Sequence, residues 1–314
     1  MGILGRDAGD VERLVRPAET GRWVVPVLVP LVVVFVAYAW IVPDGLGEAT
    51  RSVGVAAVWG LALIGTLLAT LLVLFAITAA RRGATAARQV ARTPGTWIAV
   101  AVVAYLVLLA AVSGRMAPLP VFDALDRHWQ GKVLDLLWLA ILFGMLHRWA
   151  RAEAGLRLRI TPGSARPALL TIVVVFGIFV GLSALAVALD PSAATTVDAE
   201  RLAFNATIPN LTEELIWRAA MLAVLDRAFG TPWVVLGAPV GWGIVLTSVV
   251  FGAGHGILVD LDGVWGFNVA GGLFAIVMGL ALGWIWARTR SVWPAFLLHC
   301  APELGVDVGM LVAG

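Results

Sequence analysis

The stretch from Thr212 to Arg218, Thr-Glu-Glu-Leu-Ile-Trp-Arg, places two adjacent carboxylates and a guanidinium inside a long apolar run. A charge near the middle of a bilayer costs at least about 2.5 kcal/mol, so ionisable residues found there usually line a pathway or a reaction site. On a helix, Glu214 and Arg218 lie on one face and can neutralise each other. Glu213 points about 100° away from Glu214. One carboxylate is therefore free to face something else.

Two histidines lie in later apolar runs. His255 closes the segment Phe251-Gly-Ala-Gly-His, and His299 opens the segment His-Cys-Ala-Pro-Glu303. Each histidine alone fits helix packing as well as it fits function. Together with Glu213, however, they supply the residue types that activate a water molecule: a carboxylate base and imidazoles that relay or donate protons.

A zinc site is the competing interpretation of the same residues. Glu213, His255 and His299 could ligate zinc and leave the fourth position open. The sequence contains no His-Glu-x-x-His helix, which is the usual pattern of a zinc protease. We therefore expect no cofactor, with zinc as the minority alternative.

The composition indicates where these residues lie. Of the 314 residues, 61% are hydrophobic and only 13% are charged, whereas roughly 25% are charged in soluble domains. The chain is therefore expected to be a polytopic membrane protein. Its net charge of +2 gives no evidence for nucleic-acid binding, because the arginines fall in loops between apolar runs, so the lipid bilayer is the expected partner.

Nine apolar runs are long enough, at about 20 residues each, to cross a bilayer. All are expected to be helices, since an open sheet edge would leave unpaired backbone groups in lipid. The predicted fold is all-α, with about nine transmembrane helices. The predicted spans are residues 23–42, 54–80, 97–113, 130–147, 168–189, 202–225, 234–256, 264–287 and 292–312.

The loop charges predict the orientation. Arginines fill the loops after the second, fourth and eighth predicted spans, and acidic residues fill those after the first, fifth and seventh. Because positive loops stay in the cytoplasm, we expect a multi-pass protein of the cell membrane with a cytoplasmic N-terminus and an external C-terminus.

The polar residues within apolar runs are concentrated after residue 200. This asymmetry predicts three parts. Residues 1–22 form a polar cytoplasmic tail, residues 23–160 form supporting transmembrane helices, and residues 161–314 form the reactive core.

Three motifs carry a family resemblance. The segment from Glu213 to Arg218 matches Glu-Glu-x-x-x-Arg, the segment from Phe251 to His255 matches Phe-x-x-x-His, and His299 opens a segment where His-x-x-x-Asn/Asp is expected. In this order, on successive late spans, they resemble the CPBP family of intramembrane proteases. That family includes the type II CAAX prenyl endopeptidases and the bacterial Abi-type proteins. The resemblance covers about residues 165–312.

The resemblance implies glutamate-dependent hydrolysis of a peptide bond in a membrane-embedded or lipid-linked substrate. In that family pattern, Glu213 and His255 position and deprotonate the attacking water, while His299 and residue 303 stabilise the oxyanion. Glu214 and Arg218 hold the helix and tune its charge.

Glu303 departs from the family pattern. An ionised carboxylate cannot donate a hydrogen bond to an oxyanion, so our hypothesis is that Glu303 acts as a neutral donor. The departure also supports an alternative function: a non-catalytic scaffold, or a transport-type protein that uses the buried Glu/His cluster as a proton relay.

Overall fold

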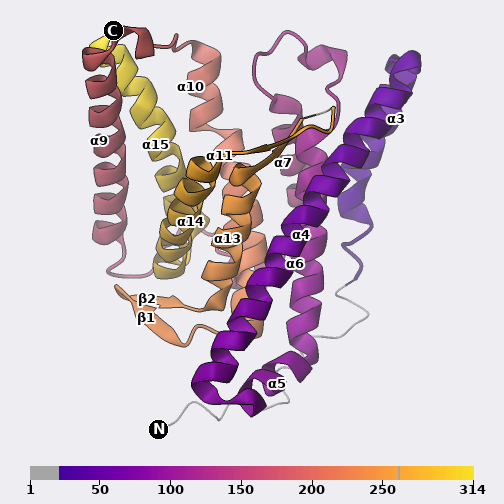
Figure 1. The fold of residues 1–314 in the computed structure, drawn as a ribbon, viewed down its shortest axis with the longest axis vertical. Coiled ribbons are helices and arrows are strands. Elements are labelled where there is room, and N and C mark those ends of the chain that lie inside the picture. The colour runs from indigo at the N-terminus through magenta and orange to yellow at the C-terminus, as the bar shows by residue number, and fades with distance from the viewer. Residues whose placement is uncertain (1–20, 261) are drawn as a thin grey trace.

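The computed structural model describes residues 21–260 and 262–314, and its described part is nearly all helical (Figure 1). Most of the polar tail predicted at residues 1–22 therefore lies outside the described residues. The first half contains η1 (Pro26–Leu28), α3 (Val29–Ile41), η2 (Pro43–Gly45), α4 (Leu46–Arg82), α5 (Ala84–Arg92), α6 (Pro94–Arg115), η3 (Pro120–Phe122), α7 (Trp129–Met145) and α8 (His147–Ala152).

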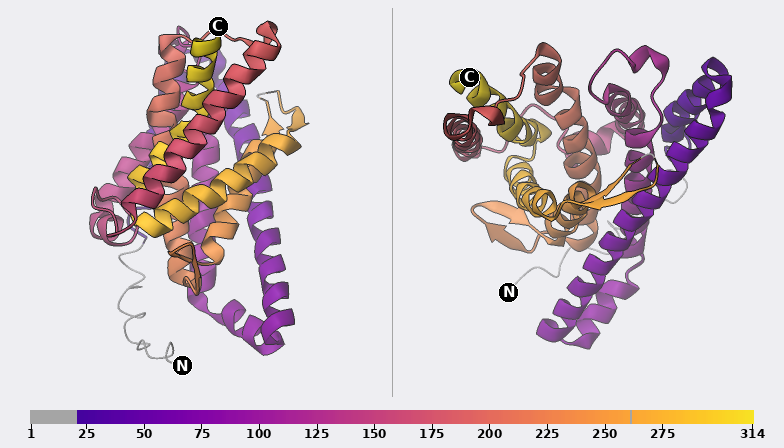
Figure 2. Two further views of the ribbon diagram at one scale, coloured as in Figure 1. Left: turned by 90° about the vertical axis from the view of Figure 1, so that its left-hand side faces the viewer. Right: turned by 45° about the horizontal axis from the view of Figure 1, so that its top comes forward.

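The second half carries the motifs. It contains α9 (Ala165–Leu189), η4 (Pro191–Ala193), α10 (Ala199–Ala206), α11 (Ile208–Glu214), η5 (Leu215–Leu222), α12 (Ala223–Phe229), β1 (Trp233–Val235), β2 (Ala238–Val240), α13 (Trp242–Gly256), β3 (Ile257–Val259), β4 (Trp265–Phe267), α14 (Val269–Thr289) and α15 (Val292–Ala313). In both views of the bundle, α9 and α15 run side by side, and α14 crosses beneath them (Figures 1 and 2).

Five helices of the described residues are long and apolar enough to cross a membrane: α4 with η2, α6, α9, α14 and α15. Two shorter apolar helices, α3 with η1 and α13, add to them. Helix α7 has 17 residues and contains Lys132 and Asp135. The protein is thus a multi-pass, nearly all-α membrane protein, and the predicted count of about nine spans is not confirmed.

The span predicted at residues 202–225 was wrong as a single straight helix. The chain leaves helical geometry at Thr207, where φ is −133° and ψ is −124°. Pro209 then stands in the first turn of α11, because a proline lacks the amide hydrogen that a continuous helix needs and fits at a helix start. The segment Leu215–Leu222 (η5) is a π-helix. π-Helical turns are rare and often mark functional sites.

Two short antiparallel hairpins also depart from the prediction of helices alone. β1 pairs with β2 through a turn in which Leu236 and Gly237 both have positive φ, 48° and 78°, as a type I′ hairpin turn requires. The predicted helix at residues 234–256 was therefore wrong at its start and begins at Trp242. Likewise β4, paired with β3, occupies the start of the span predicted at residues 264–287.

One hydrophobic core joins the two halves. Leu63, Leu67 and Leu71 of α4 recur at helical spacing and are buried in the same cluster as Trp138 of α7 and Met221 of η5. Because the halves share this core, α7 packs against α11. Side chains from the first half can therefore reach the Glu-Glu motif.

Candidate active site

Glu214 is the most buried member of the site. Its side chain is 0% exposed, and its Oε1 lies 2.9 Å from the Arg218 guanidinium and 2.7 Å from Nδ1 of His299. The ion pair that the four-residue spacing predicts is thus confirmed. The Arg218 guanidinium also lies 4.8 Å from the centre of the Phe251 ring, a cation–π contact. Glu214 therefore ties α11, η5 and α15 together and fixes the orientation of the His299 ring.

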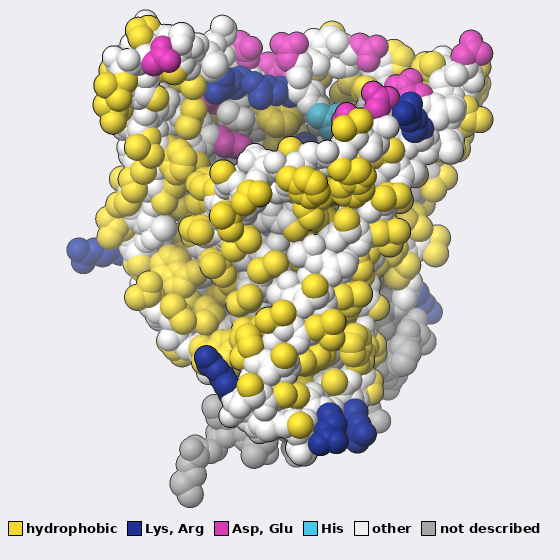
Figure 3. Space-filling model, in the orientation of Figure 1, with side chains coloured by type: hydrophobic (Ala, Val, Ile, Leu, Met, Phe, Trp, Pro, Cys, Tyr) yellow, Lys and Arg dark blue, Asp and Glu magenta, His cyan; other side chains and the backbone are white. Residues whose placement is uncertain are grey.

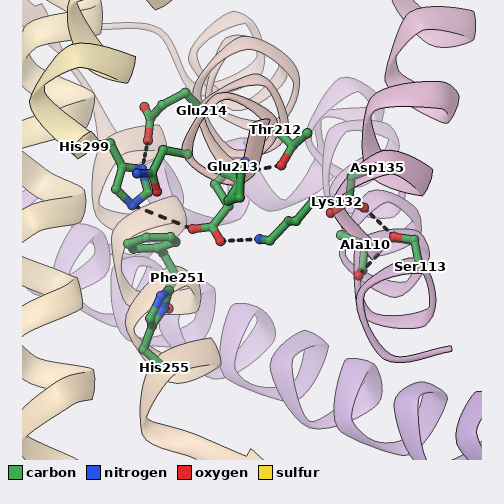
Figure 4. Close-up of polar contacts among 12 residues, drawn as sticks. Ala110, Ser113, Lys132, Asp135, Thr212, Glu213, Glu214, Phe251, His255 and His299 are labelled. Carbon is green, nitrogen blue, oxygen red and sulfur yellow. Dashed lines mark hydrogen bonds and ion pairs between the residues drawn. The ribbon is translucent and has the colours of Figure 1, made fainter. Parts of the chain in front are cut away.

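Glu213 lies between a lysine and a histidine (Figure 4). Its Oε1 is 2.5 Å from Nζ of Lys132, and its Oε2 is 3.8 Å from Nε2 of His299. The Glu213 side chain remains 22% exposed. The two adjacent glutamates therefore contact opposite nitrogens of one imidazole: Glu214 contacts Nδ1 and Glu213 faces Nε2.

His255 lies on the far side of the Phe251 ring from His299 (Figure 4). The Phe251 ring centre is 4.4 Å from that of His255 and 5.8 Å from that of His299. The exposed His255 ring has Nδ1 2.9 Å from the backbone oxygen of Phe251, which leaves Nε2 for another partner. Among the described residues, His255 makes no direct hydrogen bond or ion pair with Glu213.

A close helix crossing sets the position of His255. The backbones of α13 and α14 touch at glycines, where a Cβ added to Gly272 would lie 3.0 Å from the Gly256 Cα. A Cβ added to Gly252 would lie 2.7 Å from the Gly272 backbone oxygen. Gly252 and Gly256, on either side of His255 in the chain, thus permit the close approach of α14.

Glu303 lies one turn beyond His299 on α15, and its side chain is exposed. Its Oε2 accepts a hydrogen bond of 2.7 Å from the Asn210 side-chain amide. α15 remains a continuous helix through Pro302. Asn210 also donates to the backbone oxygen of Asn205 at 2.7 Å, so the amide anchors the α15 carboxylate to the chain just before the Glu-Glu motif.

The polar face of α15 continues for another turn. Asn205 donates a hydrogen bond of 2.7 Å to Asp307, which is also 2.7 Å from Nε of Arg201. Asp307 was not singled out from the sequence, although its spacing of four from Glu303 and eight from His299 is the signal that places all three on one face. These contacts lead from the site toward the end of the bundle where α10 begins.

Lys132 is the site residue that sequence reasoning missed. It was not singled out from the sequence, whereas it lies in the first turn of α7 and its ammonium contacts Glu213. A sequence signal exists, because Lys132 is the one lysine among the 22 basic residues. Such a singular residue at the start of an apolar helix could have been treated as a candidate.

The described residues do not assemble a ready metal centre. Among them, no three His, Cys, Asp or Glu side chains are grouped closely enough to hold a metal ion. The prediction that no cofactor is required stays a prediction.

The site is not sealed inside the bundle. His255 and Glu303 are exposed and Glu213 is partly exposed. On the face shown in Figure 3, acidic side chains gather at the end that carries the C-terminus, and a hollow at that end has basic, acidic and histidine side chains in its walls.

Comparison with known proteins bears on this geometry. Residues 198–304 match the family model described as "Type II CAAX prenyl endopeptidase Rce1-like". No curated protein and no solved structure matches the chain. The matched segment contains every residue proposed for the site from the sequence, whereas Lys132 lies outside it. The match supports, for residues 198–304, the resemblance to the CPBP family of intramembrane proteases.

Proposed function

We propose that this protein is an intramembrane endopeptidase that hydrolyses a peptide bond in a prenylated or otherwise lipid-linked substrate, using a water molecule activated by Glu213 and His255. The family match supports a CAAX-type endopeptidase. The water mechanism and the lipid-linked substrate are the proposal.

In the proposed reaction, the water oxygen attacks the carbonyl carbon of the scissile bond while Glu213 takes one of its protons. His255 orients the water through its free Nε2. Glu213 then passes the proton to the departing amine and the C–N bond breaks, so the products are an amine and a carboxylic acid, which then ionises. A His299 ring protonated at both nitrogens, with Nδ1–H donating to Glu214, and a protonated Glu303 donate hydrogen bonds to the oxyanion of the tetrahedral intermediate.

The arrangement of His299 between the two glutamates is the observation that carries this proposal. Glu214 holds Nδ1 at 2.7 Å and Glu213 faces Nε2 at 3.8 Å. A ring fixed in this way by a buried carboxylate is a prearranged donor, and a carboxylate base lies beside it. Charged side chains are costly in an apolar bundle, and a reaction site accounts for that cost more readily than packing does.

A transport role has less support. A proton relay across the membrane needs polar groups toward both faces. Polar contacts extend from the site toward α10, but in the other direction η5 presents Ala219, Ala220 and Met221, which are buried and apolar. Beyond η5, the buried Asp226 carboxylate on α12 has no hydrogen-bond partner that would connect it to the site, so the hydrogen-bonded path among the described residues leads toward one end of the bundle.

A peptide-cleavage assay tests the proposed function. The purified protein in lipid nanodiscs is incubated with a farnesylated peptide ending in a CAAX sequence and with the same peptide lacking the lipid, and products are identified by mass spectrometry. We expect cleavage of the lipid-linked peptide on the carboxyl side of the modified cysteine.

Two histidine variants sharpen this assay. We expect His255→Ala to lower the cleavage rate by roughly 100-fold or more, the usual contribution of a positioned acid–base group. His147→Ala, which removes an exposed histidine of α8, is the matched control and should leave the rate unchanged. Equal rates for the two variants would count against the role of His255, and failure to cleave any lipid-linked peptide would count against the proposed function.

A further inference from the structure

Lys132 is a contribution of the first half of the chain to the proposed site. It projects from the first turn of α7, outside the segment that matches the family model. Its Nζ lies 2.5 Å from Glu213 Oε1, and the two side chains are 20% and 22% exposed. A contact this short between a full cation and the proposed base affects both the position and the charge of that base.

Two further titratable groups lie near Lys132: Asp135 on α7, whose carboxylate also attracts the ammonium, and His128 just before α7. Asp135 lies one turn further along and is buried. Its Oδ1 accepts hydrogen bonds from the Ser113 hydroxyl and, at 3.0 Å, from Trp138 Nε1. With Asp135 held by these donors, the ammonium is directed at Glu213 (Figure 4).

Several other charged or titratable groups face the pair and belong to the electrostatic account. On the side of Glu213 they come from its own helix, η5, α13 and α15: Glu214, Arg218, His255, His299 and Glu303. Of these, His299 is the nearest to Glu213, at 3.8 Å. Lys132 is therefore the cation in closest contact with the proposed base. Its removal would reduce the electrostatic stabilisation of the Glu213 carboxylate more than the loss of any of these other groups.

We propose that Lys132 is a positioning residue of the hydrolysis, whose ammonium holds Glu213 Oε1 and keeps the carboxylate ionised so that Oε2 is presented to water beside His299. This inference rests on the proposed function. Under this proposal, α7, which lies outside the segment matched by the family model, keeps the Glu213 carboxylate ionised and oriented.

The physical reason is the cost of an isolated carboxylate in poorly hydrated surroundings. Without a nearby cation, such a carboxylate takes up a proton and can no longer accept one from water. The loss caused by removing Lys132 should therefore depend on pH, being large in acid and shrinking in alkali, where the carboxyl group ionises again. A loss of packing alone would lower the rate equally at every pH.

The pH dependence of kcat/KM tests this directly. For Lys132→Met we expect a rate about tenfold or more below wild type at about pH 6, with most of the difference gone at about pH 9. Lys132→Arg keeps the cation and should keep the wild-type shape of the pH profile. A pH-independent loss in Lys132→Met, or a gain of activity, would overturn the inference.

A stability cycle tests the pair without relying on activity. We expect Lys132→Met to lower the thermal midpoint of the purified protein and the double variant Lys132→Met/Glu213→Gln to recover most of that loss, because the double variant leaves no unpaired charge. Full additivity of the two single variants would overturn the inference. If Glu213→Gln alone retained cleavage, the proposed function would fail, whatever this cycle showed.

The single lysine also allows a chemical test on the folded wild-type protein. An amine-acetylating reagent can modify only Lys132 and the terminal amine, because every other basic residue is arginine. Acetylation removes the ammonium charge, so we expect the treated protein to show the same acid-sensitive rate as Lys132→Met. Treated Lys132→Arg, in which only the terminal amine reacts, is the matched control. Equal loss in both proteins would contradict the assignment.

Discussion

At the scale of residues, the Glu214–Arg218 pair is the charged centre around which the site is assembled. Both side chains are buried, 0% and 2% exposed. A buried pair adds little net stability, but removing one partner strands the other charge. The pair is thus expected to matter more for folding than for the chemical step.

We expect Arg218→Met to lower the free energy of unfolding by about 3–5 kcal/mol, because the buried Glu214 carboxylate would lose its guanidinium partner and keep only the contact with His299. Chemical denaturation of the purified protein in detergent measures this change. Arg227→Met is the matched control, since Arg227 pairs with Glu153 at 3.0 Å where both side chains are about one-third exposed, and such pairs contribute roughly 0–1 kcal/mol. Equal effects of the two substitutions would be inconsistent with this role.

Glu303 carries a second prediction. If it acts as a neutral donor to the oxyanion, Glu303→Gln supplies an amide donor in its place and should retain cleavage within about tenfold, whereas Glu303→Ala should lose roughly 100-fold or more. Cleavage rates of the two variants with one lipid-linked peptide decide the matter. Loss of activity in Glu303→Gln with the fold intact would refute the donor role.

Some of the site follows from sequence, and some does not. The spacing of Glu214 and Arg218 predicts their ion pair because it depends only on helical geometry. The contact between Lys132 and Glu213 joins residues 81 positions apart and depends on how α7 packs against α11. The separation of His255 from His299 by Phe251 likewise depends on the crossing of α13 with its neighbours, which no local pattern encodes.

At the scale of elements, apolar run lengths predict the long helices but not their interruptions. The hydropathy pattern of an apolar run is the same whether the run forms one helix or a helix interrupted at Pro209. The hairpin around Gly237 was likewise not predicted, because the strand residues on both sides of its turn are apolar and resemble part of an apolar helix. Its turn residues gave only a weak signal, since type I′ turns usually carry Asn-Gly rather than Leu-Gly.

The crossing of α13 and α14 yields a prediction about a single methyl group. In Gly252→Ala, the new Cβ would overlap the Ile276 side chain and press on the Gly272 backbone oxygen. We expect a loss of about 1–3 kcal/mol, as for other overpacked contacts, together with reduced cleavage because His255 lies one turn away. Thermal unfolding and cleavage assays measure the two effects.

Gly254→Ala is the matched control for this crossing. Its Cβ would make only ordinary contacts, 3.6 Å from the Trp59 ring. The variant should therefore match wild type in stability. If both alanine variants unfolded at the same temperature, the prediction that the close approach of α13 and α14 leaves no room for a methyl group at residue 252 would be wrong.

At the scale of the whole molecule, the separation of charge between the two ends predicts its orientation. Acidic side chains gather at the end where α9 finishes and α10 begins, and α5 at the opposite end carries Arg88 and Arg92 (Figures 1 and 3). From the positive-inside rule, we expect the α5 end to be cytoplasmic. The hollow at the acidic end would then open to the exterior.

Single-cysteine labelling tests this orientation. Cys300 is the only cysteine, so Cys300→Ala gives a cysteine-free background. In intact cells, a membrane-impermeant maleimide should label Ser192→Cys, in the exposed turn after α9, and should label Gln89→Cys on α5 only after lysis. Labelling in the reverse pattern would invert the predicted topology.

The most direct test of the account is the cleavage rate of Glu213→Gln. This substitution keeps the shape of the side chain but removes the base that lies between Lys132 and His299. The account predicts a fall in kcat/KM of roughly 1,000-fold or more in a protein that still folds and unfolds as one unit. Cleavage of the lipid-linked peptide at a rate within about tenfold of wild type would contradict it.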